Sequence, residues 1–301
     1  MRALTRTWRA TFAAAAFPLS LAFGLASAAH AQKAFDSPEA AMQAFGDAVT
    51  TSNDAAMDAL LGSASRRVIP PLGADLRYRF LAAWGRAHSI QAVDARTARI
   101  VVGDDGWTLP IPLVERNKRW YFDTQAGIAE IRLRRIGRNE LSTIQTMLAV
   151  YDAQREYAQT DHGGNGLAVY AKRLVSTPGK RDGLFWPTAQ GEPPSPLGPA
   201  FIEAVGRNIG SDGYHGYRYK LLTSQGPAAD GGQYSYLANG YLFGGFGVLA
   251  WPVRYGDTGI KSFIVNHQGQ VYERDLGNDT NARAEAIESF NPVPGWNKVS
   301  P

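Results

Sequence analysis

The chain has 301 residues and contains no cysteine. This absence excludes disulfide bonds, thiolate zinc sites, a cysteine nucleophile and a lipid anchor attached to cysteine. The fold must therefore be stabilised by packed apolar cores. About 270 residues lie beyond the first 31, which is enough chain for two small domains with separate cores.

Long apolar runs and catalytic motifs are also missing beyond residue 31. No stretch reaches the roughly 18 apolar residues of a transmembrane helix, so no membrane span is expected there. The sequence has no H-E-x-x-H metal motif, no G-x-S-x-G or S-x-x-K nucleophile motif, and no glycine-rich phosphate loop that opens a helix. These absences leave enzymatic activity undecided, but they favour a protein that is not an enzyme and needs no cofactor.

The charge of the chain is nearly balanced. It carries 31 Lys and Arg against 27 Asp and Glu, and three of the arginines lie in the first 31 residues, where there is no acidic residue. The remainder has 28 basic and 27 acidic residues. This balance lacks the basic footprint of a nucleic-acid-binding protein. The densest basic cluster comprises Arg132, Arg134, Arg135 and Arg138. We interpret it as a solvated helix face or a domain junction.

The first 31 residues have the pattern of a secretory signal peptide. Their first ten residues include three arginines, Arg2, Arg6 and Arg9. An apolar run follows over residues 11–25, and the segment ends on the small-x-small tripeptide Ala29-His30-Ala31. Cleavage is expected near Ala31–Gln32. The pattern predicts a periplasmic or secreted protein.

Residues 32–135 are predicted to form a small α+β domain. Three short helices come first, and they begin near Ser37, Ser52 and Asp75. The apolar period then changes to that of strands, over residues 97–102, 107–114 and 120–122. Short helices followed by an antiparallel meander resemble the cone-shaped NTF2-like domains, which enclose an apolar pocket. The resemblance makes four rings candidates to line such a pocket: Trp84, Trp107, Trp120 and Phe122.

Residues 136–301 are predicted to form a second α+β domain, a helix packed on an antiparallel sheet. The helix is expected to begin at Asn139, and a shorter helical piece to follow over residues 167–174. A proline-rich loop covers residues 176–199. Strands are predicted over residues 214–222, 246–253, 261–265 and 270–274. The fold class is therefore α+β, with two small domains.

The second unit carries strings that are long enough to be specific. They include "RRIGRNELSTIQTMLAVYDAQREYA", "YAKRLVSTPGKRDGLFWP" and "SFIVNHQGQVYERDLG", and the first unit adds "GWTLPIPLVERNKRWYFDTQAG". In this order they resemble the secreted proteobacterial proteins of domain-of-unknown-function (DUF) family 2950. The resemblance implies an exported protein and supplies no catalytic residue. The helix and sheet of the second unit also resemble the soluble heads of type IV pilins and pseudopilins, although the apolar amino-terminal stalk of pilins is missing.

Metal binding has one weak candidate, the loop that contains Asp161 and Asn165. These two residues take the positions of the first and fifth ligands of a calcium loop, but Gly163 replaces the third ligand and Lys172 the last. A turn that ends the preceding helix is the favoured interpretation. We therefore expect no metal site. The histidines beyond residue 31 show no helical pair spacing and are expected to be structural or solvated.

Aromatic residues are the most suggestive feature. Tyrosines crowd residues 214–241, and Phe243 and Phe246 follow. Exposed rings there would stack on sugars or bind a partner protein, whereas in a half-buried sheet they would pack against the helix. The candidate binding residues are Phe185, Trp186, Tyr214, Tyr217 and Tyr219.

Two functional hypotheses follow. The first is a non-catalytic protein that binds a partner or assists an envelope assembly. The alternative is a protein that binds a small apolar ligand, or less favourably an acid–base enzyme, with its pocket in the first domain. The partner is thus an unknown envelope protein or a small apolar ligand.

Overall fold

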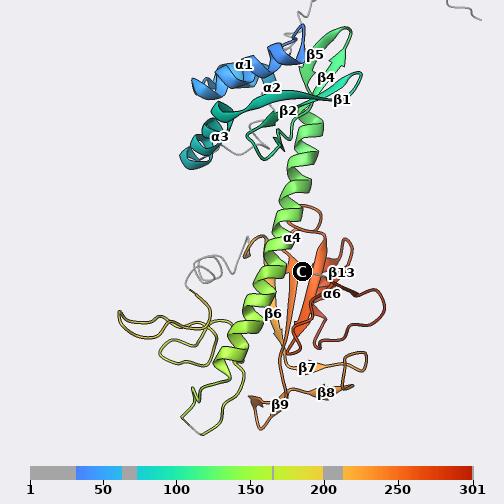
Figure 1. Cartoon of the computed structure of the whole chain (residues 1–301). Coiled ribbons are helices and arrows are strands. Elements are labelled where there is room, and N and C mark those ends of the chain that lie inside the picture. Colours follow the sequence, from blue (N-terminus) through green and yellow to red (C-terminus); the bar gives the residue numbers. More distant parts are fainter. Residues whose placement is uncertain (1–31, 63–72, 165, 199–212, 300–301) are drawn as a thin grey trace, which may run out of the picture.

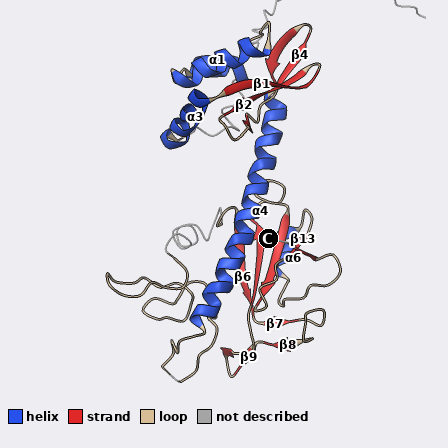
Figure 2. Ribbon diagram, viewed as in Figure 1, coloured by secondary structure: helices blue, strands red, loops and turns tan. Residues whose placement is uncertain are grey.

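The computed structural model describes residues 32–62, 73–164, 166–198 and 213–299. The predicted signal peptide, residues 1–31, lies outside the described residues. Helices and antiparallel sheets alternate along the chain, which confirms the α+β class (Figure 2). Across the described part of the chain, no helix has both the length and the apolar character needed to cross a membrane.

The N-terminal half forms three helices before its sheet, as predicted. They are α1 (Pro38–Thr50), α2 (Asp54–Leu61) and α3 (Ala74–Arg86). The side chains of Ser37 and Asn53 cap α1 and α2 by accepting the backbone N–H of Ala40 and Ala56. These caps satisfy donors that the first helical turn leaves free, and they lie at or next to the predicted starts Ser37 and Ser52.

An antiparallel sheet follows the three helices. Its strands are β1 (His88–Asp94), β2 (Thr97–Val102), β3 (Trp107–Thr108), β4 (Leu113–Arg116) and β5 (Arg119–Phe122). They run in the order β1-β2-β4-β5, with β3 paired to β2. The single strand predicted over 107–114 is divided in two, because Pro110 and Pro112 have no N–H for the ladder. The NTF2-like comparison stays a prediction.

One long helix, α4 (Thr124–Tyr157), joins the two halves of the molecule (Figure 1). The expectation that this helix begins at Asn139 was wrong. The side chain of Asp123 caps it by accepting the N–H of Ala126, and 34 continuous residues follow, about 50 Å of helix. The division at residues 135 and 136 falls inside this helix, so the two-domain description stays a prediction.

The basic cluster lies where α4 passes between the two halves. Arg134 donates hydrogen bonds to the carbonyl and hydroxyl oxygens of Thr108 in β3, at 2.7 and 3.0 Å. Arg132, two residues earlier, donates to the carbonyl of Gly256, and Arg135, the next residue, donates to the carboxylate of Asp257. Both acceptors lie in the segment of residues 253–260, in the C-terminal half. The arginines therefore tie one helix to both halves, in keeping with the junction interpretation.

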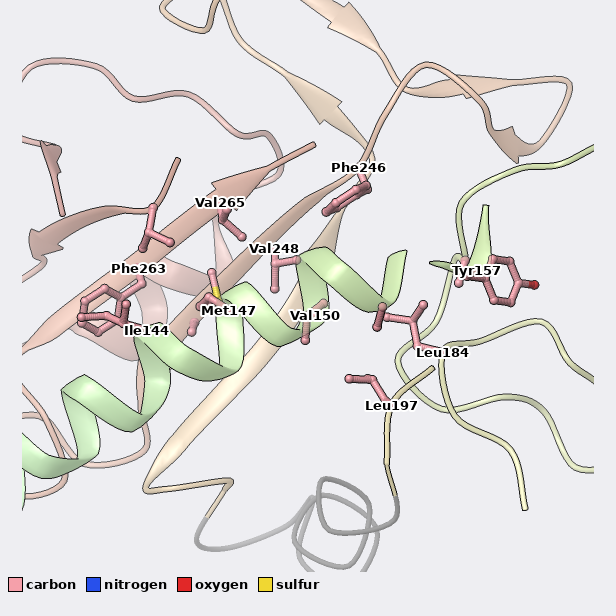
Figure 3. Close-up of a cluster of buried hydrophobic side chains, with 14 of the residues drawn as sticks. Ile144, Met147, Val150, Tyr157, Leu184, Leu197, Phe246, Val248, Phe263 and Val265 are labelled. Carbon is pink, nitrogen blue, oxygen red and sulfur yellow. The ribbon is translucent and has the colours of Figure 1, made fainter. Parts of the chain in front are cut away.

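The C-terminal half is a five-stranded antiparallel sheet. Its strands are β6 (Tyr217–Leu222), β11 (Gly247–Pro252), β12 (Lys261–Asn266), β13 (Tyr272–Asp275) and β14 (Asn297–Lys298), in the order β14-β13-β12-β11-β6. The predicted helix-on-sheet packing is confirmed. Ile144, Met147 and Val150 of α4 pack in one buried cluster with side chains of β11 and β12 that include Val248, Phe263 and Val265 (Figure 3). The pilin-like comparison stays a prediction.

The opposite face of this sheet is covered as well. The short helix α6 (Thr280–Glu285) packs against β11 and contributes Ala284 to a second cluster with Leu249, Ile264 and Phe290. Five successive residues of β12 are buried. Because both faces are covered, successive residues of the central strands are buried instead of alternating with exposed ones, and they include the polar Ser262 and Asn266.

The described residues 166–198 form no helix, so the helical piece predicted over 167–174 was wrong. The backbone is extended there because it pairs with other segments: the N–H of Tyr170 donates to the carbonyl of Leu242, and the N–H of Ala171 donates to the side-chain oxygen of Gln154. The described part of the proline-rich loop is anchored by Leu184 and Leu197, which lie in the buried cluster under α4 (Figure 3).

Candidate functional site

An exposed group of apolar side chains lies at the far end of the C-terminal sheet, on three two-residue strands. These strands are β8 (Tyr234–Ser235), β9 (Leu237–Ala238) and β10 (Tyr241–Leu242). Four side chains there are large, apolar and more than a third exposed: Tyr234 (37%), Leu237 (40%), Tyr241 (36%) and Phe243 (63%). We call Leu237, Tyr241 and Phe243 the apolar tip. Large apolar side chains that are exposed together on one short segment indicate a contact surface more often than an isolated exposed residue does.

The geometry of the tip follows from its turn. Asn239 and Gly240 connect β9 and β10, and both have positive φ angles, of 51° and 78°. A two-residue turn with both φ values positive matches the twist of a hairpin, and Asn-Gly is the pair that adopts it most readily. In this register Leu237 pairs with Leu242 and Ala238 pairs with Tyr241, so Leu237 and Tyr241 lie close to the turn on opposite faces of the hairpin.

Two residues of the segment that follows α4 bind the hairpin of β9 and β10 to the rest of the protein. Leu242 is fully buried, and its carbonyl accepts the N–H of Tyr170 at 2.9 Å. Lys172 donates from its ammonium group to the carbonyl of Gly240 at 2.9 Å and lies 5.9 Å from the centre of the Tyr241 ring. The tip is thus an exposed surface on a hairpin that is held at both its base and its turn.

Beside the tip, a buried polar group supports the strand β7 (Ser224–Gln225), which pairs with β8. The hydroxyl of Tyr236 donates to the side-chain oxygen of Gln225 at 3.0 Å, and the side-chain nitrogen of Gln225 donates to the carbonyls of Asp230 and Gly232 at 2.7 Å each. Burial raises the pKa of Tyr236. Its hydroxyl therefore stays protonated and remains a donor.

His267 extends this buried group toward the main core. Its ring meets that of Tyr236 edge to face, with centroids 5.4 Å apart, and that of Phe246 at 6.5 Å. Burial lowers the pKa of His267, so its ring is neutral near pH 7. The Nδ1 atom is buried and has no hydrogen-bond partner among the described residues.

The binding residues expected from the sequence are mostly inside the protein. Tyr217 is fully buried and donates its hydroxyl to the carbonyl of Lys261 at 2.9 Å, and Trp186 is only 7% exposed. These two rings are therefore buried, and binding through them stays a prediction. The others, Phe185, Tyr214 and Tyr219, are half-buried against the same core cluster. In this part of the sheet the aromatic side chains pack against the helix, which is the alternative given above for a half-buried sheet.

The rings expected to line an N-terminal pocket are absent from the lining of the cavity described below, so the pocket stays a prediction. Phe122 is 1% exposed, and Trp84 and Trp120 pack against the N-terminal core cluster that contains it. Trp107 is 44% exposed and lies under the guanidinium of Arg134. One cavity among the described residues of this half is lined by Leu109, Pro110 and other residues, has a volume of about 150 Å³, and includes none of the four rings. It is smaller than the roughly 300 Å³ at which ligand pockets begin.

The candidate calcium loop behaves as a turn that follows the helix. The carboxylate of Asp161 accepts the backbone N–H groups of Gly163, Gly164 and Gly166, at 2.6–3.0 Å. Asn165 lies outside the described residues. Within the described ranges, no three acidic or histidine side chains gather in a group that could hold a metal ion.

Sequence reasoning pointed to the tyrosine-rich region and to Phe243 but did not identify Leu237, the hairpin or the buried group that supports it. The dipeptide Asn239-Gly240 between apolar residues is a strong hairpin signal, and it would have placed Leu237 and Tyr241 on an exposed turn. No comparable signal exists for Gln225, whose partners lie 5 to 11 residues away in an irregular loop.

Comparison with known proteins gives one match. A family model described as "Protein of unknown function (DUF2950)" matches residues 32–299. The match begins at the residue that follows the predicted cleavage site. No curated protein and no solved structure matches the chain.

Proposed function

Since the chain belongs to this family of proteins of unknown function, we propose from its own geometry that it is an exported, non-catalytic module that binds a partner protein of the cell envelope through the apolar tip. The observation that carries the proposal is the exposure of Leu237, Tyr241 and Phe243 on a hairpin that is anchored on both sides. An anchored apolar surface loses little conformational freedom when it is covered, which favours binding.

The composition of the tip supports a protein as the partner. Aromatic side chains are enriched at the centres of protein interfaces, where their large apolar area is removed from water. The tip combines two aromatic rings with a leucine, and the nearby ammonium group of Lys172 is held by Gly240 at its edge. An apolar centre with a polar edge is the usual arrangement of such an interface.

Export is supported by the sequence of residues 1–31 and by the start of the family match at residue 32. Fractionation of the host cell, followed by determination of the amino terminus, tests it. We expect the mature chain to begin at or near Gln32 in the periplasmic or secreted fraction. A cytoplasmic chain that retains its first 31 residues would contradict export.

Partner binding is tested by purification of the protein from its own host under mild conditions. The double substitution Leu237→Ser and Phe243→Ser should abolish recovery of a stoichiometric partner, because it removes most of the exposed apolar area of the tip. Leu141→Ser is the matched control, since Leu141 is 67% exposed on α4, far from the tip in sequence. Equal recovery of the same partner with both variants would place the interface elsewhere.

A further inference from the structure

A cavity of about 620 Å³ lies beside the apolar tip, between the β7–β8 hairpin and the segment of residues 288–291. Its volume falls within the roughly 300–1,000 Å³ that is usual for small-molecule sites. It is a shallow cavity, widely open to solvent, and is lined mainly by hydroxyl and amide side chains, with one carboxylate and one aromatic ring. This combination differs from the apolar lining of lipid or drug-like sites.

Three of the lining side chains keep their hydrogen-bonding capacity. Gln233, Glu288 and Ser289 have no side-chain hydrogen-bond partner among the described residues, and all three line the cavity. An amide supplies a donor and an acceptor, a carboxylate supplies acceptors, and a hydroxyl supplies both. A ligand that carries several hydroxyl groups, each of them both donor and acceptor, satisfies such a set best.

Tyr234 gives the cavity a flat apolar surface. The ring is 37% exposed, and it meets the buried ring of Tyr236 edge to face, with centroids 5.4 Å apart at 80°. Its hydroxyl donates to the carbonyl of Gly244 at 3.3 Å. The ring is therefore held in one orientation, and an exposed, oriented ring can stack on the apolar C–H face of a sugar.

The walls of the cavity are fixed by hydrogen bonds before any ligand arrives. Gln225 holds the loop 226–233 through the carbonyls of Asp230 and Gly232. The opposite wall is joined to this loop by the N–H of Gly226, which donates to the carbonyl of Phe290 at 2.9 Å, and by the N–H of Ala228, which donates to the side-chain oxygen of Asn291 at 3.0 Å. A site built in this way needs little ordering on binding.

From these observations we infer that the cavity binds a neutral carbohydrate, with Tyr234 stacked on a sugar ring and the polar walls bonded to its hydroxyl groups. No lysine or arginine is among the residues that line it, and the carboxylate of Glu288 disfavours an anionic ligand. This site is separate from the partner-binding proposal, because it uses none of the three residues of the apolar tip. Either inference can fail without the other.

The inference is tested by saturation-transfer NMR and calorimetry on the purified protein. The probes are tetramers of N-acetylglucosamine, glucose linked β-1,4 and glucose linked α-1,4, with tetragalacturonate and a neutral tetrapeptide as comparison ligands. We expect at least one neutral tetramer to bind. Tyr234→Ala should weaken it by about tenfold or more through loss of stacking, whereas Tyr234→Phe, which keeps the ring, should retain binding.

Phe243→Ala is the matched control, because it removes an exposed ring of the tip and leaves the cavity lining intact. It should bind the same tetramer as the unchanged protein does. The inference is overturned if none of the three neutral tetramers binds at millimolar concentration, if Tyr234→Ala and Phe243→Ala behave alike, or if the tetrapeptide or tetragalacturonate is preferred. Circular dichroism of Tyr234→Ala checks that the fold is unchanged.

Discussion

The hydroxyl of Tyr236 donates a hydrogen bond to the side-chain oxygen of Gln225 across 3.0 Å, and the two side chains are 0% and 1% exposed. This bond is one of several contacts between the two segments, since the backbone N–H of Tyr236 also donates to the carbonyl of Thr223 at 2.8 Å. The two surfaces that we assign to binding therefore lie on either side of one buried polar contact.

Tyr236→Phe should destabilise the protein by about 1–3 kcal/mol, because it leaves a buried acceptor of Gln225 without its partner. Tyr234→Phe is the matched control, since its hydroxyl is on an exposed residue and makes a longer bond of 3.3 Å. Urea unfolding of both variants measures the difference. Equal free energies of unfolding would show that the buried bond contributes no more than the exposed one.

Two glycines of α4 should respond in opposite directions to alanine. A Cβ at Gly127 would lie 2.5 Å from the side chain of Ile111 and 3.0 Å from its Cα, so Gly127→Ala should destabilise by about 1–3 kcal/mol. A Cβ at Gly137 would meet no described atom within 4 Å. Gly137→Ala should therefore stabilise by up to about 1 kcal/mol, from helix propensity. Thermal unfolding of the pair checks both signs. Stabilisation by both substitutions would contradict the close packing of α4 on the N-terminal half.

Glu140 should be needed for the contact between α4 and the C-terminal sheet. One of its carboxylate oxygens accepts the backbone N–H groups of Ile260 and Lys261, at 2.8 and 2.9 Å. Glu140→Ala leaves both donors without this partner and should cost about 2 kcal/mol or more, because bonds to a charged acceptor are strong. Glu156→Ala, an exposed position on the same helix, should change the free energy of unfolding by less than about 0.5 kcal/mol. Chemical denaturation distinguishes the two, and an equally small effect of both would rule out the contact.

Stability should fall as the pH drops through the range in which free histidine takes up a proton. Burial lowers the folded-state pKa of His267, and also those of His162 and His215. A histidine of lowered pKa stays neutral in the folded protein while the unfolded chain binds a proton, below about pH 6.5. The free energy of unfolding should therefore decrease from about pH 7.5 to pH 5.5.

The substitution His267→Gln isolates the contribution of His267 to this pH dependence of the free energy of unfolding. In this variant the decrease between those two pH values should be smaller than in the unchanged protein, because one of the three groups no longer titrates. An identical pH profile for both proteins would mean that His267 titrates alike in the folded and unfolded states.

Much of the fold could be predicted from local signals in the sequence. Ser37 and Asn53 cap their helices at or next to the predicted starts, Ser37 and Ser52, and the strand of residues 97–102 has the predicted bounds. These predictions were correct because helix caps and the apolar period are set by only a few neighbouring residues. The α+β class and the helix on an antiparallel sheet followed from the same signals.

The errors arose where distant segments decide the local structure. The segment 167–174 has a helical pattern but pairs with Leu242 and Gln154, and these partners satisfy its backbone in an extended form. The start of α4 was placed too late because its first turns are polar and glycine-containing, although Asp123 caps them.

The site was harder to predict than the fold, because burial depends on what covers each ring. Tyr217 and Tyr241 are the same residue type in the same region, yet one is fully buried beneath α4 and the other is 36% exposed on a hairpin turn. Composition alone gave no means to separate them, whereas the Asn239-Gly240 turn would have identified the exposed member.

The most direct test of the central claim is photo-crosslinking in the living host, with a photoreactive amino acid placed at Phe243 and, in a separate strain, at Leu141. These positions are 63% and 67% exposed, so access of the reagent is matched. We predict that position 243 yields one discrete adduct with an envelope protein and that position 141 does not. Adducts of the same pattern from both positions, or none from position 243, would contradict partner binding through the apolar tip.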